Sequence, residues 1–255
     1  MADRKLLVTG ASGHLGRRVV ELLLEAKAGQ VVAVTRTPDK LKDFAAKGVE
    51  VRAGNFDDPA SLEKAFVDVD RLLLISTDEL SRPGQRLIQH QNAVAAAQKV
   101  GVKHVVYTSM PKPEPGNPIT FAPDHYGTEQ ALKASSLSWT ILRHNWYTDF
   151  LIPKLSQAIS KGKLFGAPGE GGAAYVTRED CARADVAALI STETNNRTLD
   201  VTGPGVVTGA QLAQLAAKIT GKPVGYMSVA ASTIKAGLAG ALGLYPTMIL
   251  SLPKA

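Results

Sequence analysis

The chain has 255 residues, of which 45% are hydrophobic and 20% are charged, and its net charge is +6. This ordinary globular composition argues against a disordered or fibrous protein, and the length allows one large domain or one domain with a small lobe. The lysines and arginines are scattered rather than gathered in a block, so we expect no nucleic-acid partner.

The single cysteine, Cys181, excludes an internal disulfide and a multi-cysteine metal site. We expect it to be a small buried hydrophobe in a cytoplasmic protein, because the cytosol is reducing. The first residues lack the pattern of a secretory leader. The uncharged residues 236–252 approach the length of a membrane span, but Pro246 and several glycines favour a buried helix and loop, so we expect no membrane partner.

The first part of the chain alternates short apolar runs with longer helical patterns. Helices are expected to begin near Leu15, Pro38 and Pro59 and to span 83–100. Strands that are apolar on both faces and separated by helices indicate a parallel sheet with helices on both sides. The predicted strands are Leu6–Thr9, Val31–Thr35, Val49–Ala53, Arg71–Ile75, Val102–Thr108 and Trp139–Leu142.

The second part changes character. A glycine-rich loop is expected at Gly166–Gly172, a helix at Arg178–Ser191, a strand at Thr198–Val201, and a helix at Thr208–Ile219 with Thr208 as its cap. We interpret this part as a small substrate lobe from which one strand returns to the main sheet.

The strongest motif is the glycine-rich segment GASGHLG, residues 10–16, between the first strand and the first helix. The pyrophosphate of a dinucleotide needs close backbone approach, free N–H groups and the positive end of a helix dipole. Glycines allow that approach, and the strand–loop–helix context strengthens the interpretation over a glycine turn without a ligand. The candidate cofactor residues here are Gly10, Ser12, Gly13, His14 and Leu15.

Arg36 follows the second strand, where an NAD site usually places an acidic residue against the ribose 2′-hydroxyl. A guanidinium there can clamp a 2′-phosphate, and Lys40 lies one turn further on. The sequence therefore predicts NADP(H) as the cofactor. The alternative is that Arg36 is a solvated surface charge.

Two further strand ends belong to the predicted cofactor site. Asn55 and Phe56 could recognise and cover the adenine, or could form a plain turn before the helix at Pro59, and both interpretations stay open. The run Ile75, Ser76 and Thr77 ends the fourth strand, where the middle of the cofactor should pass, because ligands bind at the carboxyl ends of such strands.

Taken together, these segments resemble the atypical short-chain dehydrogenase/reductase family called NmrA-like, especially its quinone oxidoreductase and triphenylmethane-dye reductase members. The resemblance covers most of residues 5–220. It rests on VTGASGHLG at 8–16, LLLIS at 72–76, QHQN at 89–92, GVKH at 101–104, YTS at 107–109, Asp124 and His125 with Thr128 and Glu129, and LRHNWY at 142–147.

The resemblance implies NADPH-dependent reduction of quinone-like or dye-like acceptors by direct hydride transfer, without a flavin. The chain departs from the family pattern at His144, where the common version has Asn, so the contact of His144 with the nicotinamide is in question. The chain also ends earlier than the family pattern, which implies a substrate lobe that is more open or differently closed.

The Ser and Tyr-x-x-x-Lys set of ordinary members is missing, since Tyr126 is followed four residues later by Gln130. The resemblance instead places His125 and Glu129 at the tyrosine and lysine positions. Residues four apart share a helix face, so a carboxylate-oriented histidine could donate a proton. The alternative is a polar helix face without chemistry.

Aromatic residues gather after the sixth strand, as Trp146, Tyr147 and Phe150, with Met110 after the fifth. They could line a flat slot for a planar acceptor, although core packing explains each one as well. Ser109 is a candidate contact to cofactor or substrate. His90 and His104 lack metal-ligand spacing, so no metal is expected.

The sequence therefore predicts an α/β protein with a Rossmann-type doubly wound parallel sheet at 1–150 and a smaller substrate lobe at 151–255. Its predicted activity is NADPH-dependent reduction of a quinone or similar planar acceptor. The alternatives are a non-catalytic NADP(H)-binding redox sensor, and a ketone or imine reductase or an isomerase on the same scaffold. The sequence leaves room for a homodimer.

Overall fold

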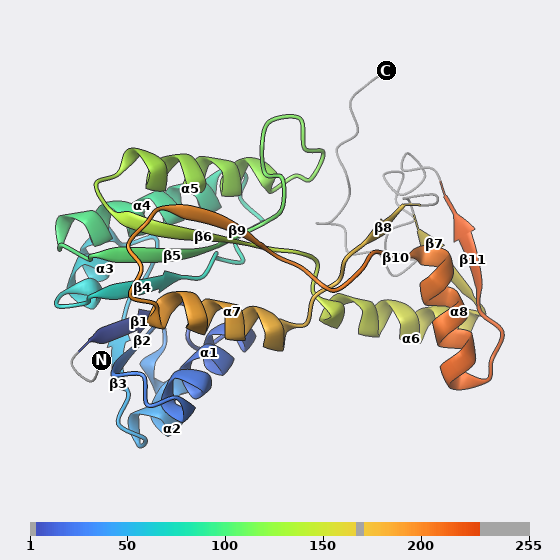
Figure 1. Cartoon of the computed structure of the whole chain (residues 1–255), viewed down its shortest axis with the longest axis horizontal. Coiled ribbons are helices and arrows are strands. Elements are labelled where there is room, and N and C mark those ends of the chain that lie inside the picture. Colours follow the sequence, from blue (N-terminus) through green and yellow to red (C-terminus); the bar gives the residue numbers. More distant parts are fainter. Residues whose placement is uncertain (1–3, 167–170, 230–255) are drawn as a thin grey trace. The chain divides into compact units, whose positions relative to one another are not determined.

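Seven parallel strands form the main sheet, in the order β3-β2-β1-β4-β5-β6-β9 (Figure 1). The computed structural model describes residues 4–166 and 171–229. The order reverses at β1, which lies between β2 and β4, and ligands of doubly wound sheets bind beyond the strand ends at such a reversal. The predicted Rossmann-type sheet is confirmed.

Helices cover both faces of this sheet, with α3, α4 and α5 on one face and α1 and α7 on the other (Figure 1). The strands are β1 (Lys5–Val8), β2 (Gln30–Thr35), β3 (Glu50–Ala53), β4 (Arg71–Leu74), β5 (His104–Ser109), β6 (Ser138–His144) and β9 (Arg197–Val201). The helices are α1 (His14–Glu25), the 3-10 turn η1 (Pro38–Leu41), α2 (Lys42–Ala45), α3 (Pro59–Phe66), α4 (Gln85–Lys99), α5 (Ala122–Ala134) and α7 (Arg178–Ile190).

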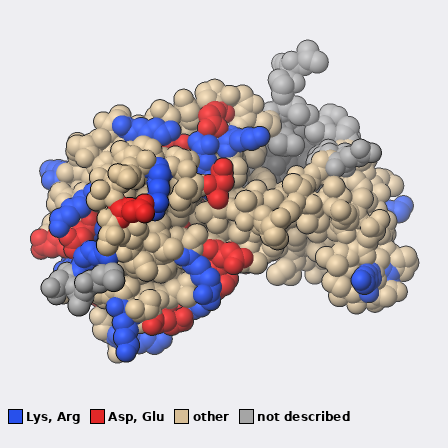
Figure 2. All heavy atoms as spheres, viewed as in Figure 1, with Lys and Arg blue, Asp and Glu red and all other residues tan. Residues whose placement is uncertain are grey.

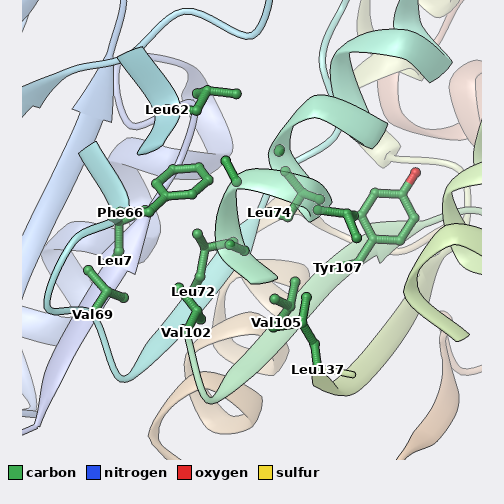
Figure 3. Packing of buried hydrophobic residues seen from close by; sticks show 14 of the residues in the cluster. Leu7, Leu62, Phe66, Val69, Leu72, Leu74, Val102, Val105, Tyr107 and Leu137 are labelled. Atoms are coloured by element: carbon green, nitrogen blue, oxygen red, sulfur yellow. The ribbon is translucent and has the colours of Figure 1, made fainter. Parts of the chain in front are cut away.

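The core between the sheet and α3, α4 and α5 is aliphatic with a few rings. Leu72 and Leu74 of β4 and Val105 of β5 are fully buried against Phe66 of α3 (Figure 3). Burying a side chain of this size contributes about 1.5–3 kcal/mol, so this layer fixes the sheet whose ends carry the site. Tyr107 in the same cluster is also fully buried, with its hydroxyl among polar neighbours.

The described residues divide into two compact units. The first contains 4–113, 123–144 and 179–201, and the second contains 114–122, 145–166, 171–178 and 202–229. The predicted return of a strand is observed, since β9 pairs with β6, and α7 belongs to the sheet unit as well. Beyond its short strands, the second unit contains the turn η2 (Thr148–Phe150) and helices α6 (Leu151–Lys161) and α8 (Gly209–Thr220).

Short strands in the second unit were not expected from the sequence. The strand β7 (Lys163–Gly166) pairs with β11 (Gly225–Ser228), and β8 (Gly172–Ala173) pairs with β10 (Val207–Thr208). The predicted loop at Gly166–Gly172 is therefore flanked by strand residues at both ends. The predicted Thr208 cap is confirmed, because its side chain accepts from the Gln211 N–H and Gln211 returns a bond to the Thr208 N–H.

Several predicted boundaries differ by a few residues. The fifth strand begins at His104 rather than Val102, because a turn at Gly101 (φ +77°) precedes it. The helix predicted from Pro83 begins at Gln85, after Gly84 in the left-handed region. The sixth strand runs on to His144, which places that side chain on the sheet rather than in the loop after it.

Basic and acidic side chains are interspersed over the sheet unit on the face shown in Figure 2. Among the described residues, no helix is long and apolar enough to cross a membrane. The expected buried helix and loop at 236–252 lies outside the described residues.

Candidate functional site

The glycine-rich loop joins β1 to α1 with no room for side chains at its tightest point. A Cβ built on Gly16 would lie 2.3 Å from the carbonyl oxygen of Gly10 and 2.8 Å from the Cα of Ala11. Gly10 itself has φ +59°, in the left-handed region. Gly13 caps α1 without a side-chain hydrogen bond, and the first turn contains no acidic residue. This arrangement fits the pyrophosphate of a dinucleotide.

The remaining residues of the glycine-rich loop differ in how far their side chains are buried. Leu15 is buried and His14 is exposed at the first position of α1. The Ser12 hydroxyl lies 2.9 Å from the Thr35 hydroxyl at the end of β2. Thr35 Oγ1 also accepts from the Thr37 N–H, at 3.2 Å. These bonds link the glycine-rich loop to the segment that carries Arg36.

Arg36 and Lys40 are both exposed, next to the carboxyl end of β2. Neither side chain has an ion pair or hydrogen-bond partner among the described residues, although most charged groups nearby are paired. Arg17, for example, pairs with Asp43 and lies 4.6 Å from the ring centroid of Phe44. Two cations without a partner among the described residues, at the position predicted for the ribose, suit a 2′-phosphate.

Asn55 and Phe56 form a turn before α3, which is one of the two interpretations that the sequence left open. The Asn55 side-chain oxygen accepts from the Asp57 N–H, at 3.1 Å, and Asp58 caps α3 by accepting from two backbone N–H groups. Phe56 packs against the sheet core, and its carbonyl accepts from the Asn92 amide of α4. The adenine contact of these two residues stays a prediction.

The segment after β4 is held by side chains rather than by backbone partners. The N–H groups of Ile75, Ser76 and Thr77 donate to Thr9 Oγ1, Thr108 Oγ1 and His90 Nε2, each at 2.9 Å. These three consecutive backbone donors are satisfied within the protein, so the segment is fixed before a ligand arrives.

His90 is fully buried, and its hydrogen-bond directions are determined by its neighbours. Its Nε2 must accept because Thr77 offers a backbone N–H, and its Nδ1–H then donates to Thr128 Oγ1 at 2.9 Å. The Thr128 hydroxyl in turn donates to the carbonyl of Asp124, at 2.7 Å. Burial, and after it the nearby Arg86 charge, lowers the pKa of His90 to about 3, so the ring is neutral.

His125 lies inside the same layer rather than at a surface. Its side chain is buried, its Nε2 lies 3.0 Å from the Arg86 guanidinium, and its Nδ1 lies 2.8 Å from the Tyr107 hydroxyl. Because a guanidinium only donates, Nε2 accepts and Nδ1 carries the hydrogen. Burial, followed by the Arg86 charge, lowers the pKa of His125 well below its usual range. This geometry argues against the proton-donor role considered for His125.

Glu129 has different partners from His125, so the expected orientation of His125 by Glu129 needs correction. The fully buried Glu129 carboxylate accepts from the Ser109 hydroxyl at 2.8 Å and from the Arg143 guanidinium at 2.8 and 2.9 Å. Ser109 ends β5 and Arg143 lies beside it on β6. A buried carboxylate needs such a partner, and this pair fastens α5 to the sheet.

His144 ends β6 and faces the other side of the sheet, because successive strand residues alternate. Its Nε2 lies 3.0 Å from Oδ1 of Asp185 on α7, and both side chains are buried. Burial raises the pKa of Asp185, and the His144 charge opposes that rise. The sequence had pointed to His144 but not to Asp185.

The predicted acceptor residues fall in both units. Met110 is buried in the sheet unit, and Trp146, Tyr147 and Phe150 belong to the second unit. In that unit the rings of Tyr147 and Phe150 stack with centroids 5.9 Å apart, and the Arg178 guanidinium lies 5.2 Å from the Tyr147 centroid. Their acceptor contacts stay predictions.

Sequence reasoning missed the buried or partly buried polar residues that pair with the candidates. These are Arg86, Tyr107, Arg143 and Asp185, together with the hydrogen-bonding role of His90. One signal was available, because Arg143 directly follows the apolar segment predicted as a strand and Asp185 lies within the segment predicted as a helix. Charged residues at such positions are buried only with partners. Those partners lie far away in the sequence.

The comparisons with known proteins agree with this geometry. A family model described as NAD(P)H-binding matches residues 10–196. Quinone oxidoreductase 2 of Escherichia coli is 35% identical over 234 residues, which are 91% of this chain and 80% of that protein. An NmrA-like family domain-containing oxidoreductase of Aspergillus flavus is 30% identical over 224 residues, covering 86% and 73% of the two chains.

Solved structures of the same kind superpose closely. The NADPH complex of the Escherichia coli quinone oxidoreductase has a TM-score of 0.88 and 34% identity, covering 95% of this chain and 86% of the other. The NADP(H) complex of Citrobacter sp. triphenylmethane reductase has a TM-score of 0.86 and 33% identity, covering 96% and 87%. The chain therefore belongs to the NAD(P)H-binding, NmrA-like group of atypical short-chain dehydrogenases/reductases, and it is an NAD(P)H-dependent oxidoreductase of the quinone reductase-like kind.

Proposed function

We propose that this oxidoreductase prefers NADPH and reduces quinones or similar planar acceptors. The observation that carries the cofactor preference is Arg36, an exposed guanidinium without a partner among the described residues, at the end of β2. Arg36 and Lys40 would hold the 2′-phosphate, and the glycine-rich loop would hold the pyrophosphate. When bound, NADPH supplies the hydride.

The residues after β4, β5 and β6 would complete the cofactor site. Ile75, Ser76 and Thr77 form a preorganised edge, since their backbone donors are already bonded. Ser109 and His144 end the next two strands of the sheet. Structures of two similar reductases were determined with NADPH or NADP(H), which supports the same cofactor here.

The acceptor class follows from the missing Tyr–Lys pair and from the surroundings of Ser109 and His125. Reduction of a simple ketone produces a strongly basic alkoxide and depends on an acid such as the missing Tyr–Lys pair. Reduction of a quinone or a cationic dye produces a much less basic product. The Ser109 hydroxyl donates to Glu129, and His125 is neutral and buried, so neither supplies strong acid catalysis. The stacked Tyr147 and Phe150 rings offer a planar apolar surface that suits such an acceptor.

The test is NADPH consumption by the purified protein with a simple quinone, beside NADH and a simple ketone. We expect quinone-dependent oxidation of NADPH that exceeds the protein-free rate, the NADH rate and the rate with ketone. Equal rates with NADPH and NADH would refute the cofactor preference. Faster turnover of the ketone would refute the acceptor class.

A further inference from the structure

The Asp185 carboxylate is a poorly satisfied buried group in the sheet unit as described. It is fully buried on α7, and among the described residues neither of its oxygens accepts a well-aligned hydrogen bond. Its one close charged neighbour there is His144, with Nε2 at 3.0 Å. A buried carboxylate in this state is destabilising, so its presence calls for a reason.

The location of the pair suggests that reason. His144 is the last residue of β6, at the carboxyl edge of the sheet where ligands of doubly wound folds bind. Asp185 approaches it from α7, which covers the sheet face opposite α4 and α5 (Figure 1). The Arg143–Glu129 pair occupies that other face, so the two ion pairs are separate.

We propose that Asp185 is a positioning residue acting through His144, and that the pair holds one proton at the edge of β6 for delivery to the reduced acceptor. The inference rests on the proposed function, because it assigns a proton donor to the same reaction. Loss of the proton would leave a buried, uncompensated carboxylate beside a neutral ring, so the buried position of Asp185 keeps that proton in the pair.

The proton balance of the step is simple. The established activity delivers a hydride to the acceptor, which leaves a negative charge on the acceptor oxygen. The His144 imidazolium gives its Nδ1 proton to that oxygen and becomes neutral, with its Nε2–H still on the Asp185 side. Water then returns one proton to His144. Each turnover consumes one hydride and one solvent proton.

Other titratable groups near His144 must be considered in a test of pH dependence. On α7 the titratable group near His144 is Asp185. On α5 it is His125, whose pKa is lowered in part by the His144 charge. On β6 itself, Arg143 is paired with Glu129 on the opposite face. Removing the Asp185 carboxylate is therefore expected to act mainly on His144.

The first experiment follows the histidine ring signals of the cofactor-free protein by NMR, with His144 assigned through His144→Asn. We expect Asp185→Asn to move the His144 titration midpoint down by about one pH unit or more, since an opposite charge at this distance favours the protonated form. Asp180→Asn, on an exposed part of the same helix, is the matched control and should leave the midpoint unchanged. Equal midpoints in wild type and Asp185→Asn would overturn the proposal.

The second experiment measures kcat and KM against pH with two acceptors whose reduced forms differ in basicity. Asp185→Asn should lower kcat about tenfold at neutral pH, more for the more basic product, with KM for NADPH little changed. If Asp185→Asn lost stability but kept the wild-type dependence of kcat on pH, the His144–Asp185 pair would have a structural role only, and the proposal would be refuted. Should Asp185→Asn fail to fold, His144→Asn must show the same loss of kcat, and wild-type kcat there would refute it.

The two experiments separate this proposal from the proposed function. If the wild-type protein does not oxidise NADPH with a quinone, the proposed acceptor class fails. The NMR titration still decides whether Asp185 keeps the proton on His144, because it uses neither cofactor nor acceptor.

Discussion

At the scale of single residues, the candidate site contains two kinds of polar side chain that sequence alone does not separate. Arg36 is exposed and has no partner among the described residues, whereas His125 is buried between Arg86 and Tyr107. An unpaired exposed cation is available to a ligand, and a buried ring with both nitrogens engaged is available only at the cost of those bonds. Substitution of Arg36 should therefore change cofactor binding, whereas substitution of His125 should change stability.

For Arg36→Ala we expect KM for NADPH to rise about tenfold or more, with KM for NADH nearly unchanged. The reason is that a charge-assisted, often bidentate contact to the 2′-phosphate is lost, and NADH never makes that contact. Initial rates with both cofactors measure this. Arg183→Ala, an exposed arginine on α7, is the matched control and should leave the ratio as in wild type. A parallel rise of both KM values would contradict a specific 2′-phosphate contact.

For His125→Phe we expect the protein to lose stability. We do not expect the reaction to lose a catalytic proton donor. The substitution leaves the buried Arg86 guanidinium without its acceptor at Nε2, which costs roughly 2–3 kcal/mol of unfolding free energy. Urea denaturation measures that loss, and the pH profile of kcat/KM for the folded fraction should keep its shape. If an ionisation in that profile disappeared in His125→Phe, His125 would be the acid after all.

At the scale of elements, the segment after β4 shows how helices α4 and α5 position a strand end. His90 of α4 accepts from the Thr77 N–H and donates to Thr128 of α5. Thr77 Oγ1 also donates to Gln89 of α4, at 2.7 Å. Residues of α4 and α5 thus position the end of β4, which is expected to contact the cofactor.

Substitutions of His90 should show whether its hydrogen bond to the Thr77 N–H positions the segment after β4, or whether the ring only fills space. A glutamine side chain can still present an acceptor to the Thr77 N–H, whereas phenylalanine fills the space and leaves that buried N–H unsatisfied. We expect His90→Phe to raise the Kd for NADPH several-fold and His90→Gln to restore much of the affinity. Fluorescence titration with NADPH measures both. Equal affinity in the two variants would show that the hydrogen bond does not position the segment.

At the scale of the whole molecule, buried neutral histidines make the fold sensitive to acid. The pKa is lowered to about 3 in His90 and to about 4 in His104, and it is lowered well below its usual range in His125, in each case mainly by burial. Below pH 6.5 the unfolded chain therefore binds protons that the folded chain excludes. Stability should fall as pH decreases from about 6.5 towards 4.

Each of these histidines adds up to about 1.4 kcal/mol per pH unit to that loss. We expect His90→Gln to be less stable at pH 7 but to lose less stability between pH 6.5 and 4. Urea denaturation across this range measures the slope. His14→Gln, at an exposed position, should keep the wild-type slope. Asp185, whose pKa is raised by burial, contributes in the opposite direction. A slope in His90→Gln equal to that of the wild type would contradict the assignment.

Most of the sheet could be predicted from the sequence, because it depends on local patterns. The apolar runs of β1, β2, β4 and β5, the GASGHLG loop and the Thr208 cap each lie within a few adjacent residues. The second unit was predicted less well. Its strands β7, β8, β10 and β11 are only two to four residues long, and both of their pairings join segments far apart in the chain.

The sequence by itself determined the Rossmann-type sheet, the glycine-rich loop between β1 and α1, and the place of Arg36 at the end of β2, since glycine spacing and a residue's place after a strand are local properties. Only the tertiary structure decided which polar side chains are buried and with which partners. It joined His125 to Arg86 and Tyr107, Glu129 to Arg143, and His144 to Asp185. The reason is physical, because the pKa and the hydrogen bonds of a buried group depend on neighbours brought together from distant strands and helices.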